Sequence, residues 1–214
     1  MMEKTLNFLS ELKIHNDPAW FMDHIGEYER AKTEVFDLAY LILDELASLD
    51  PALNREIDVG RFISSLVIIK PKKNVHYLTY FDLSISPLMN GGNEPVYRIH
   101  IDPEGSYISV LFVPDVFGLQ ITRSFIIKNI SELNAALLEA FSAGFLLNDL
   151  KKGALPKGYQ AGVIGEDYMK LPFYELTCPI DFSKGRDLLI SDIISSFALA
   201  VQFLQFFRKA LGLV

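Results

Sequence analysis

The chain has 214 residues but only one cysteine, Cys178, and one tryptophan, Trp20. A single cysteine cannot form a disulfide within the chain or supply a cysteine-rich zinc site, and it is typical of proteins from a reducing compartment. Cys178 precedes Pro179 and has no histidine near it in sequence, which favours a free structural thiol. We therefore expect a cytoplasmic protein that folds without a metal or another cofactor.

Excess positive charge and long hydrophobic runs are also lacking. The formal net charge of −7 argues against a nucleic-acid partner, since phosphate binding depends on an excess of Lys and Arg. Residues 193–207 carry no charge, but they include serines and glutamines and fall short of the roughly 20 apolar residues of a membrane-spanning helix. The first residues do not resemble a secretory signal. We predict a buried core helix at 193–207 and no membrane partner.

Local motifs for common chemistries are absent as well. The sequence has no HExxH pair, no GxSxG nucleophile elbow and no phosphate-binding loop. The four histidines, His15, His24, His76 and His100, do not have the spacing of metal ligands. The paired acidic residues lie in no pattern that would fix a catalytic water, which favours a solvated surface. We predict no metal site and place no catalytic residue.

The hydrophobic pattern predicts helices near both ends and strands between them. Apolar residues three or four apart predict helices, whereas short stretches rich in β-branched or aromatic residues predict strands. The predicted helices are 5–13, 18–50, 121–128, 131–145 (capped by Ser131) and 187–211; the predicted strands are 62–69, 80–86, 96–102 and 107–113, with 174–178 as a further candidate. This order predicts a single α+β domain, residues 1–214, whose antiparallel β-sheet packs against N-terminal and C-terminal helices.

The stretch HNDPAWF combines a helix-start signal with the one tryptophan. Asp17 can accept hydrogen bonds from the first backbone N–H groups of a helix, and Pro18 suits the first helical position. The following helix is long, so we expect a kink near Thr33. Trp20 is predicted to anchor the first two helices against the sheet, with a loss of roughly 3–5 kcal/mol on truncation to alanine.

Residues 96–102 show the first candidate site. The two-residue period of a strand puts Arg98, His100 and Asp102 on one face and apolar side chains on the other. The polar face either meets water, as in many antiparallel sheets, or lines a groove where His100 acts as an acid, a base or an anion donor.

A basic stretch at 70–77 provides the second candidate. Lys70, Lys72 and Lys73 precede Tyr77 in an otherwise acidic chain. Such a stretch can hold a phosphate or carboxylate. The alternative is a charged hairpin loop that keeps the protein soluble, because charge runs are usually solvated.

The order of motifs resembles the domain-of-unknown-function family 2461. The stretches FLSELKIH and NDPAWF resemble that family's opening, Phe-Leu-x-x-Leu-x-x-Asn-Asn-x-x-x-Trp-Phe, and His24 and Tyr28 follow on the same helix. LASLDP, YRIHIDPEGSYIS and LPKGY, which contains Lys157, resemble later motifs in the same order. The chain departs from the family where members carry a block of Arg, Asp and Lys: RFISSLVIIKPKKNVHY keeps few of those charges, so this sequence resembles a divergent member.

Three functions remain open. The first is a non-enzymatic binding or accessory domain for a small anionic ligand, contacted by Lys70, Lys72, Tyr77, Arg98, His100 and Lys157. The second is a hydrolase or phosphate-handling enzyme with His100 as general base and Arg98 stabilising negative charge. The third is a protein-interaction module with an apolar surface. The sequence leaves the oligomeric state open.

Overall fold

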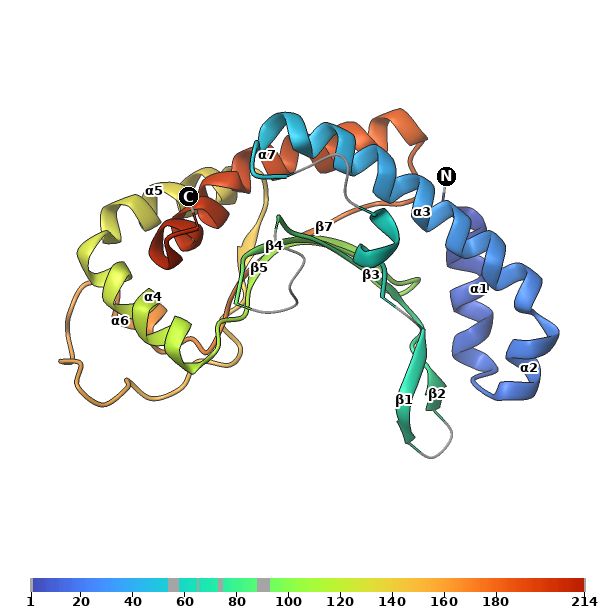
Figure 1. The fold of residues 1–214 in the computed structure, drawn as a ribbon, viewed down its shortest axis with the longest axis horizontal. Helices are drawn as coiled ribbons and strands as arrows, with labels where there is room; N and C mark the ends of the chain where they lie inside the picture. Colours follow the sequence, from blue (N-terminus) through green and yellow to red (C-terminus); the bar gives the residue numbers. More distant parts are fainter. Residues whose placement is uncertain (1, 54–57, 65, 73–74, 88–92, 214) are drawn as a thin grey trace. The chain divides into compact units, whose positions relative to one another are not determined.

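A computed structural model describes residues 2–53, 58–64, 66–72, 75–87 and 93–213, with the side chains of 67–72 outside this description. The α+β class with an antiparallel sheet is confirmed. The main sheet has the order β3-β4-β5-β7-β6 (Figure 1). Its strands are β3 (Phe81–Ile85), β4 (Val96–Ile101), β5 (Tyr107–Phe112), β6 (Leu146–Leu147) and β7 (Tyr174–Pro179). Strands β6 and β7 are antiparallel, with Leu146 opposite Thr177.

The strand predicted at 62–69 begins later than expected. A 3-10 helix, η1 (Val59–Phe62), occupies its start, because the Asp58 side chain accepts a hydrogen bond from the Gly60 N–H and favours a turn there. The extended backbone starts at β1 (Val67–Lys72), which pairs antiparallel with β2 (Val75–Tyr77) in a separate two-stranded sheet. Most of the basic stretch is thus strand rather than loop.

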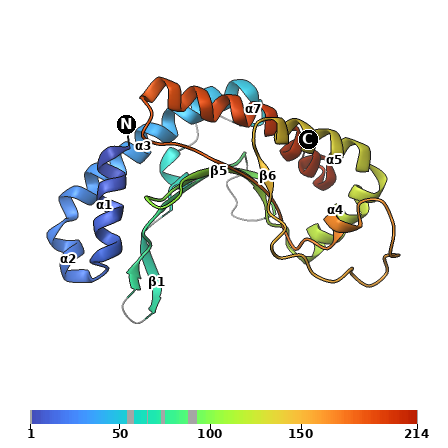
Figure 2. The ribbon, with the colours of Figure 1, turned by 180° about the vertical axis from the view of Figure 1, so that it is seen from behind.

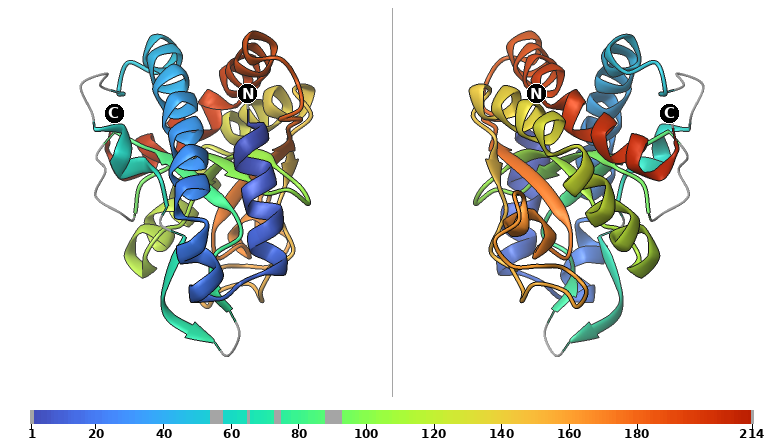
Figure 3. Two further views of the ribbon diagram at one scale, coloured as in Figure 1. Left: turned by 90° about the vertical axis from the view of Figure 1, so that its right-hand side faces the viewer. Right: turned by 90° about the vertical axis from the view of Figure 1, so that its left-hand side faces the viewer.

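By its internal contacts the chain forms two compact units, the first comprising Met1–Pro87, Arg98–Ile108 and Pro179–Ile194, and the second Leu88–Tyr97, Ser109–Cys178 and Ser195–Val214. The helices of the first unit are α1 (Glu3–Ile14), α2 (Pro18–Asp23) and α3 (Ile25–Leu49). Helices α1 and α3 lie side by side in Figures 1, 2 and 3. The Thr5 hydroxyl, 0% exposed, donates to the Ala31 carbonyl at 3.0 Å across this contact.

The helix start at Asp17-Pro18 is confirmed, since the Asp17 carboxylate accepts from the N–H groups of Ala19 and Trp20. The predicted kink near Thr33 is wrong. The break lies at His24, whose ring nitrogen Nδ1 contacts the Trp20 carbonyl at 2.8 Å and competes for a helical acceptor. The Thr33 hydroxyl instead donates to the Glu29 carbonyl inside the uninterrupted helix α3.

Aromatic rings fill the core of the first unit. Phe8 contacts Phe21 and Tyr28, and Tyr28 faces Phe81 at 6.5 Å between ring centroids. The three N-terminal helices are thereby joined to β3. Trp20 is half-buried; its indole stacks on His24 at 4.1 Å and on Phe8 at 6.0 Å.

The second unit contains α4 (Val116–Lys128), α5 (Ile130–Ser142), α6 (Glu166–Met169) and the C-terminal part of α7 (Arg186–Leu211). Helix α4 starts before the predicted residue 121, because Asp115 caps it through the Gly118 N–H. The predicted cap Ser131 is wrong: the N-cap residue of α5 is Asn129.

Helix α7 is long and apolar enough to cross a membrane by length and composition alone. Its rings, however, pack within the second unit as those of a core helix do. Phe197 contacts Tyr97, Phe206 contacts Phe125, and Phe207 contacts Tyr174. The contacts agree with the predicted core helix at 193–207.

Candidate functional site

Strand β4 has the predicted two faces. Tyr97, Ile99 and Ile101 are 0% exposed, whereas Arg98 and His100 on the other face are half-buried. Successive side chains of a strand point to opposite faces of the sheet. The polar side chains of β4 therefore line one face, while its apolar side chains pack into the core on the other. All residues of the site described next belong to the first unit.

Asp82 on β3 joins the two polar residues of β4. Its carboxylate accepts hydrogen bonds from Arg98 Nε at 3.1 Å and Arg98 Nη2 at 2.8 Å, a two-point contact. The same carboxylate lies 2.7 Å from His100 Nδ1. β3 is the neighbour of β4 in the sheet, so Asp82 reaches both side chains on one face. We call Asp82, Arg98, His100 and Asp102 the polar cluster.

Two tyrosines enclose the imidazole of His100. The centroid of its ring lies 4.7 Å from that of Tyr80 and 4.6 Å from that of Tyr107. The Arg98 guanidinium also lies over the Tyr107 ring, at 5.7 Å. These contacts, together with the bond to Asp82, fix the ring plane and direct His100 Nε2 towards Asp102, 3.8 Å away.

A lysine from helix α1 closes the cluster on the Asp102 side. Lys13 Nζ lies 3.1 Å from the Asp102 carboxylate and 2.9 Å from that of Glu104. The pKa of Lys13 is raised, first by the hydrogen bond to Glu104 and also by Asp102, with desolvation opposing both. The C-terminal end of α1 is thus tied to the turn between β4 and β5.

Acidic groups outnumber the arginine and lysine of this region, since Asp82, Asp102 and Glu104 pair with Arg98 and Lys13. Burial raises the pKa of Asp82, but the hydrogen bonds from His100 and Arg98 and their charges outweigh it, and the net pKa lies below the ordinary value. Asp82 is therefore an ionised orienting group. What the arrangement supplies chemically is an imidazole whose Nδ1 is held by the Asp82 carboxylate and whose Nε2 faces a second carboxylate, that of Asp102, at 3.8 Å.

The structure places the remaining predicted site residues as follows. Tyr77 packs its ring on Phe21 at 4.1 Å, a structural contact, and its backbone carbonyl accepts from the Asn16 side chain. The side chains of Lys70 and Lys72 lie outside the described residues. Lys157 is exposed and belongs to the second unit.

Sequence reasoning missed four residues of the site: Asp82, Tyr80, Tyr107 and Lys13. The two-residue period puts Tyr80 and Asp82 on one face of the predicted strand 80–86, so a signal for them existed. The sequence contains no such signal for Lys13, because Lys13 lies 89 residues from Asp102 and only the packing of α1 brings the two side chains together.

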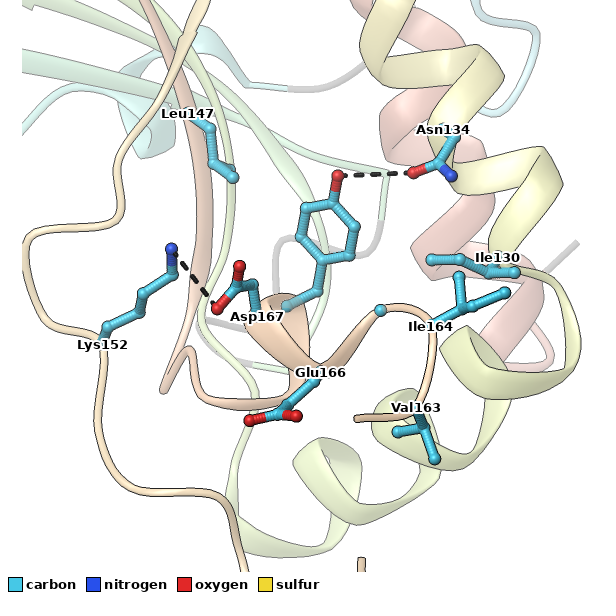
Figure 4. A pocket seen from close by; sticks show the side chains of 10 residues that line it. Ile130, Asn134, Leu147, Lys152, Val163, Ile164, Glu166 and Asp167 are labelled. Atoms are coloured by element: carbon cyan, nitrogen blue, oxygen red, sulfur yellow. Dashed lines mark hydrogen bonds and ion pairs between the residues drawn. The ribbon is translucent and has the colours of Figure 1, made fainter. Parts of the chain in front are cut away.

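The second unit has a pocket of its own, with a volume of about 470 Å³ (Figure 4). Lys152 and Asp167 face each other across it at 3.8 Å, and the Tyr168 hydroxyl donates to Asn134 Oδ1 at 3.3 Å. Gly165 adopts φ +88°, and a Cβ there would meet Ile130 at 2.9 Å, so the turn before α6 requires glycine. The charges at this pocket pair with one another.

Among the described residues, no group of three His, Cys, Asp or Glu side chains is arranged to hold a metal ion. Burial raises the pKa of the Cys178 thiol, whose sulfur lies 3.6 Å from the Ala143 carbonyl. A raised pKa lowers the thiolate fraction. These contacts fit the interpretation of Cys178 as a structural thiol.

The fold and the site define a class: an α+β protein whose antiparallel sheet carries an oriented Asp-His-Arg cluster on its half-buried face. Within that class the chain belongs to the family described as Conserved hypothetical protein (DUF2461), whose model matches residues 4–206. The resemblance seen in the motifs is confirmed. Searches of curated proteins and of solved structures found no match.

Proposed function

We propose that this protein is a non-enzymatic binding or accessory domain that holds a small anionic ligand at the polar cluster, with Arg98 and His100 as ligand contacts. The hydrogen bond from His100 Nδ1 to Asp82 carries the proposal. It assigns Nδ1 to Asp82. Nε2, which lies 3.8 Å from the Asp102 carboxylate, makes no hydrogen bond within the described ranges and is the nitrogen that we propose for the ligand. Asp82 then orients both contacts without touching the ligand.

The ligand's charge needs cations beyond the cluster, because the carboxylates of Asp82, Asp102 and Glu104 already outnumber Arg98 and Lys13. The hairpin β1–β2 supplies Lys70 and Lys72 as candidates. This hairpin is joined to the chain just after α1: Asn16, three positions after Lys13, binds the backbone of Tyr77 through the oxygen and the nitrogen of its side-chain amide. A ligand with more than one negative charge, such as a phosphate, suits this set of cations.

A second candidate function is a hydrolase or phosphate-handling enzyme with His100 as general base. The favouring observation is again the Asp82–His100 contact, since a carboxylate on Nδ1 holds the lone pair on Nε2. The described contacts of His100 include no serine, threonine or cysteine side chain, so the attacking group in this mechanism is a water molecule.

Thermal unfolding with inorganic phosphate and pyrophosphate tests the binding proposal, with chloride at equal ionic strength as the reference. A ligand at a hundredfold excess over its Kd stabilises by about 2.7 kcal/mol, which raises Tm by roughly 5–10 °C for a chain of this size. The variant His100→Gln should lose most of that shift. The control His15→Gln, which changes an exposed histidine of the same unit, should keep it.

A full shift in His100→Gln would overturn the assignment of His100 as a contact. Hydrolysis of p-nitrophenyl phosphate by the wild type that disappears in His100→Gln and survives in His15→Gln would replace the binding proposal with the enzyme.

A further inference from the structure

The pocket of the second unit is large enough for a small molecule and is open to solvent. Its volume of about 470 Å³ falls within the range of roughly 300–1,000 Å³ that is typical of small-molecule sites. The side chain of Asp167 is 70% exposed and Ile164 is 75% exposed, so the lining is reached from solvent. All the lining residues belong to the second unit.

Asp167 is the acid of this pocket that has no close donor. Lys152 makes its short contact with Asp149, at 3.0 Å. Lys170 makes its short contact with Glu166, at 2.6 Å. Both lysines lie 3.8 Å from Asp167, which is too long for a hydrogen bond, and in the part of the chain that the structure describes no other group donates to this carboxylate. Three acids thus share two lysines, and Asp167 carries the unbalanced charge.

A tyrosine hydroxyl provides a second acceptor. Tyr168 follows Asp167 on α6, is half-buried, and donates its O–H proton to Asn134 Oδ1 at 3.3 Å. The pKa of Tyr168 is raised, mainly by burial and also by the charge of Asp167, so the phenol keeps this proton at neutral pH. A phenol that donates its one proton still has lone pairs that accept. The pocket therefore combines a charged acceptor with a neutral one.

Much of the remaining lining is apolar. Ile130 comes from α5, Leu147 from β6, and Val163 and Ile164 from the segment before α6. Figure 4 shows Ile130 and Ile164 on the side of the pocket opposite Lys152, towards which the Asp167 carboxylate is turned. A ligand that has an apolar body and one charged end matches this division, because its body covers the isoleucines while its end reaches Asp167.

We infer that this pocket binds a small primary amine in its ammonium form, through the carboxylate of Asp167 and the hydroxyl oxygen of Tyr168. An ammonium group has three N–H donors and one positive charge, which match the two acceptors and the single unbalanced acid. An anionic ligand would add to the excess of acids, and a neutral ligand would leave that excess in place. The site is separate from the polar cluster of the first unit, for which we propose an anion.

Thermal unfolding of the full chain with 2-phenylethylamine tests this inference at pH 7. The amine should raise the Tm, because a ligand that binds only the folded state stabilises it. 2-Phenylethanol, which has the same body without the charge, and phenylacetate, which has the opposite charge, should leave the Tm unchanged. Sodium chloride at equal ionic strength is the reference.

The acceptors are tested by variants that keep the shape of each side chain. Calorimetry should show the amine binding at least about tenfold more weakly in Asp167→Asn, since a charged hydrogen bond is lost, and about fivefold more weakly in Tyr168→Phe. Glu139→Gln is the matched control: Glu139 is an exposed acid of α5 outside the lining, and its variant should bind like the wild type. The Tm of each variant without ligand shows that it folds.

The variant Lys152→Gln should bind the amine more tightly, by about twofold to fivefold, because it removes a positive charge that competes for Asp167. Damage to the fold would weaken binding, so a gain reports on charge alone. The control Lys151→Gln changes an exposed neighbour outside the lining and should have little effect.

The inference is overturned if the amine does not raise the Tm of the wild type, or if 2-phenylethanol raises it equally. It is also overturned if the affinity for the amine survives in Asp167→Asn or falls in Lys152→Gln. The variant His100→Gln should keep the amine shift while it loses the phosphate shift, so failure at one site is distinguishable from failure at the other.

Discussion

Asp82 is the residue on which the polar cluster depends. It accepts from Arg98 and His100 at once, and it is itself held by Ser64, whose hydroxyl accepts from the Asp82 N–H at 2.9 Å. A carboxylate with these donors is stabilised in its ionised form, which explains why its pKa is lowered although burial acts the other way.

The variant Asp82→Asn should lower the free energy of unfolding at pH 7 by about 1–3 kcal/mol, because hydrogen bonds to a charged group are lost. Folding lowers the pKa of Asp82 below its ordinary 3.8, so this stabilisation is present above that pH and is lost as the pH falls towards the lower value in the fold. Urea unfolding at pH 7 and pH 3 should show a smaller difference between wild type and variant at pH 3. An equal difference at both would contradict the ionic role. Glu104→Gln, at a 76% exposed side chain, is the control.

Trp20 acts as an anchor, but a weaker one than its sequence context predicts. Because the indole is half-buried and contacts His24, His15 and Phe8, Trp20→Ala should cost about 1–3 kcal/mol rather than the 3–5 of a fully buried ring. Chemical denaturation measures the loss, and Trp20→Phe should recover at least part of it. No loss in the alanine variant would remove the anchoring role.

At the scale of elements, the β1–β2 hairpin is held largely by hydrogen bonds to one side chain, that of Asn16. Asn16, between α1 and α2, accepts from the N–H groups of His76 and Tyr77 at 2.7 and 2.9 Å and donates to the Tyr77 carbonyl. Its side chain thus makes hydrogen bonds to the backbone of β2 like those that a neighbouring strand would make. The ring contact of Tyr77 with Phe21 also holds the hairpin.

The variant Asn16→Ala should release the hairpin locally. Amide hydrogen exchange at His76 and Tyr77 should speed up roughly tenfold, since about 1–1.5 kcal/mol of hydrogen bonding is lost there, while exchange in α3 stays unchanged. Asn16→Asp keeps the acceptor oxygen and should retain most of the protection. Unchanged exchange in Asn16→Ala would mean that packing alone positions β2.

At the scale of the whole molecule, charge limits the partners. With a net charge of −7, the chain should show no salt-dependent binding to mixed DNA or RNA in a fluorescence anisotropy titration at low ionic strength. An affinity that falls steeply with added salt would reveal a basic surface and would require the hairpin lysines to be reassigned from a small ligand to a nucleic acid.

The sequence by itself determined the local features. The two-residue period of 96–102 set which side chains of β4 are buried, helical spacing located α1, α5 and α7, and Asp17-Pro18 set the start of α2, because each depends on neighbours within a few residues. His24 broke the long helix through a side-chain contact that periodicity does not describe.

Only the tertiary structure decided the partners. Asp82 lies 18 residues from His100 and Lys13 lies 89 from Asp102, and strand order and helix packing bring them together. The spacing of apolar residues along a strand or helix indicates which face a side chain lies on. Its neighbours on that face depend on which other strands and helices pack against it, and burial of the whole core determines that packing.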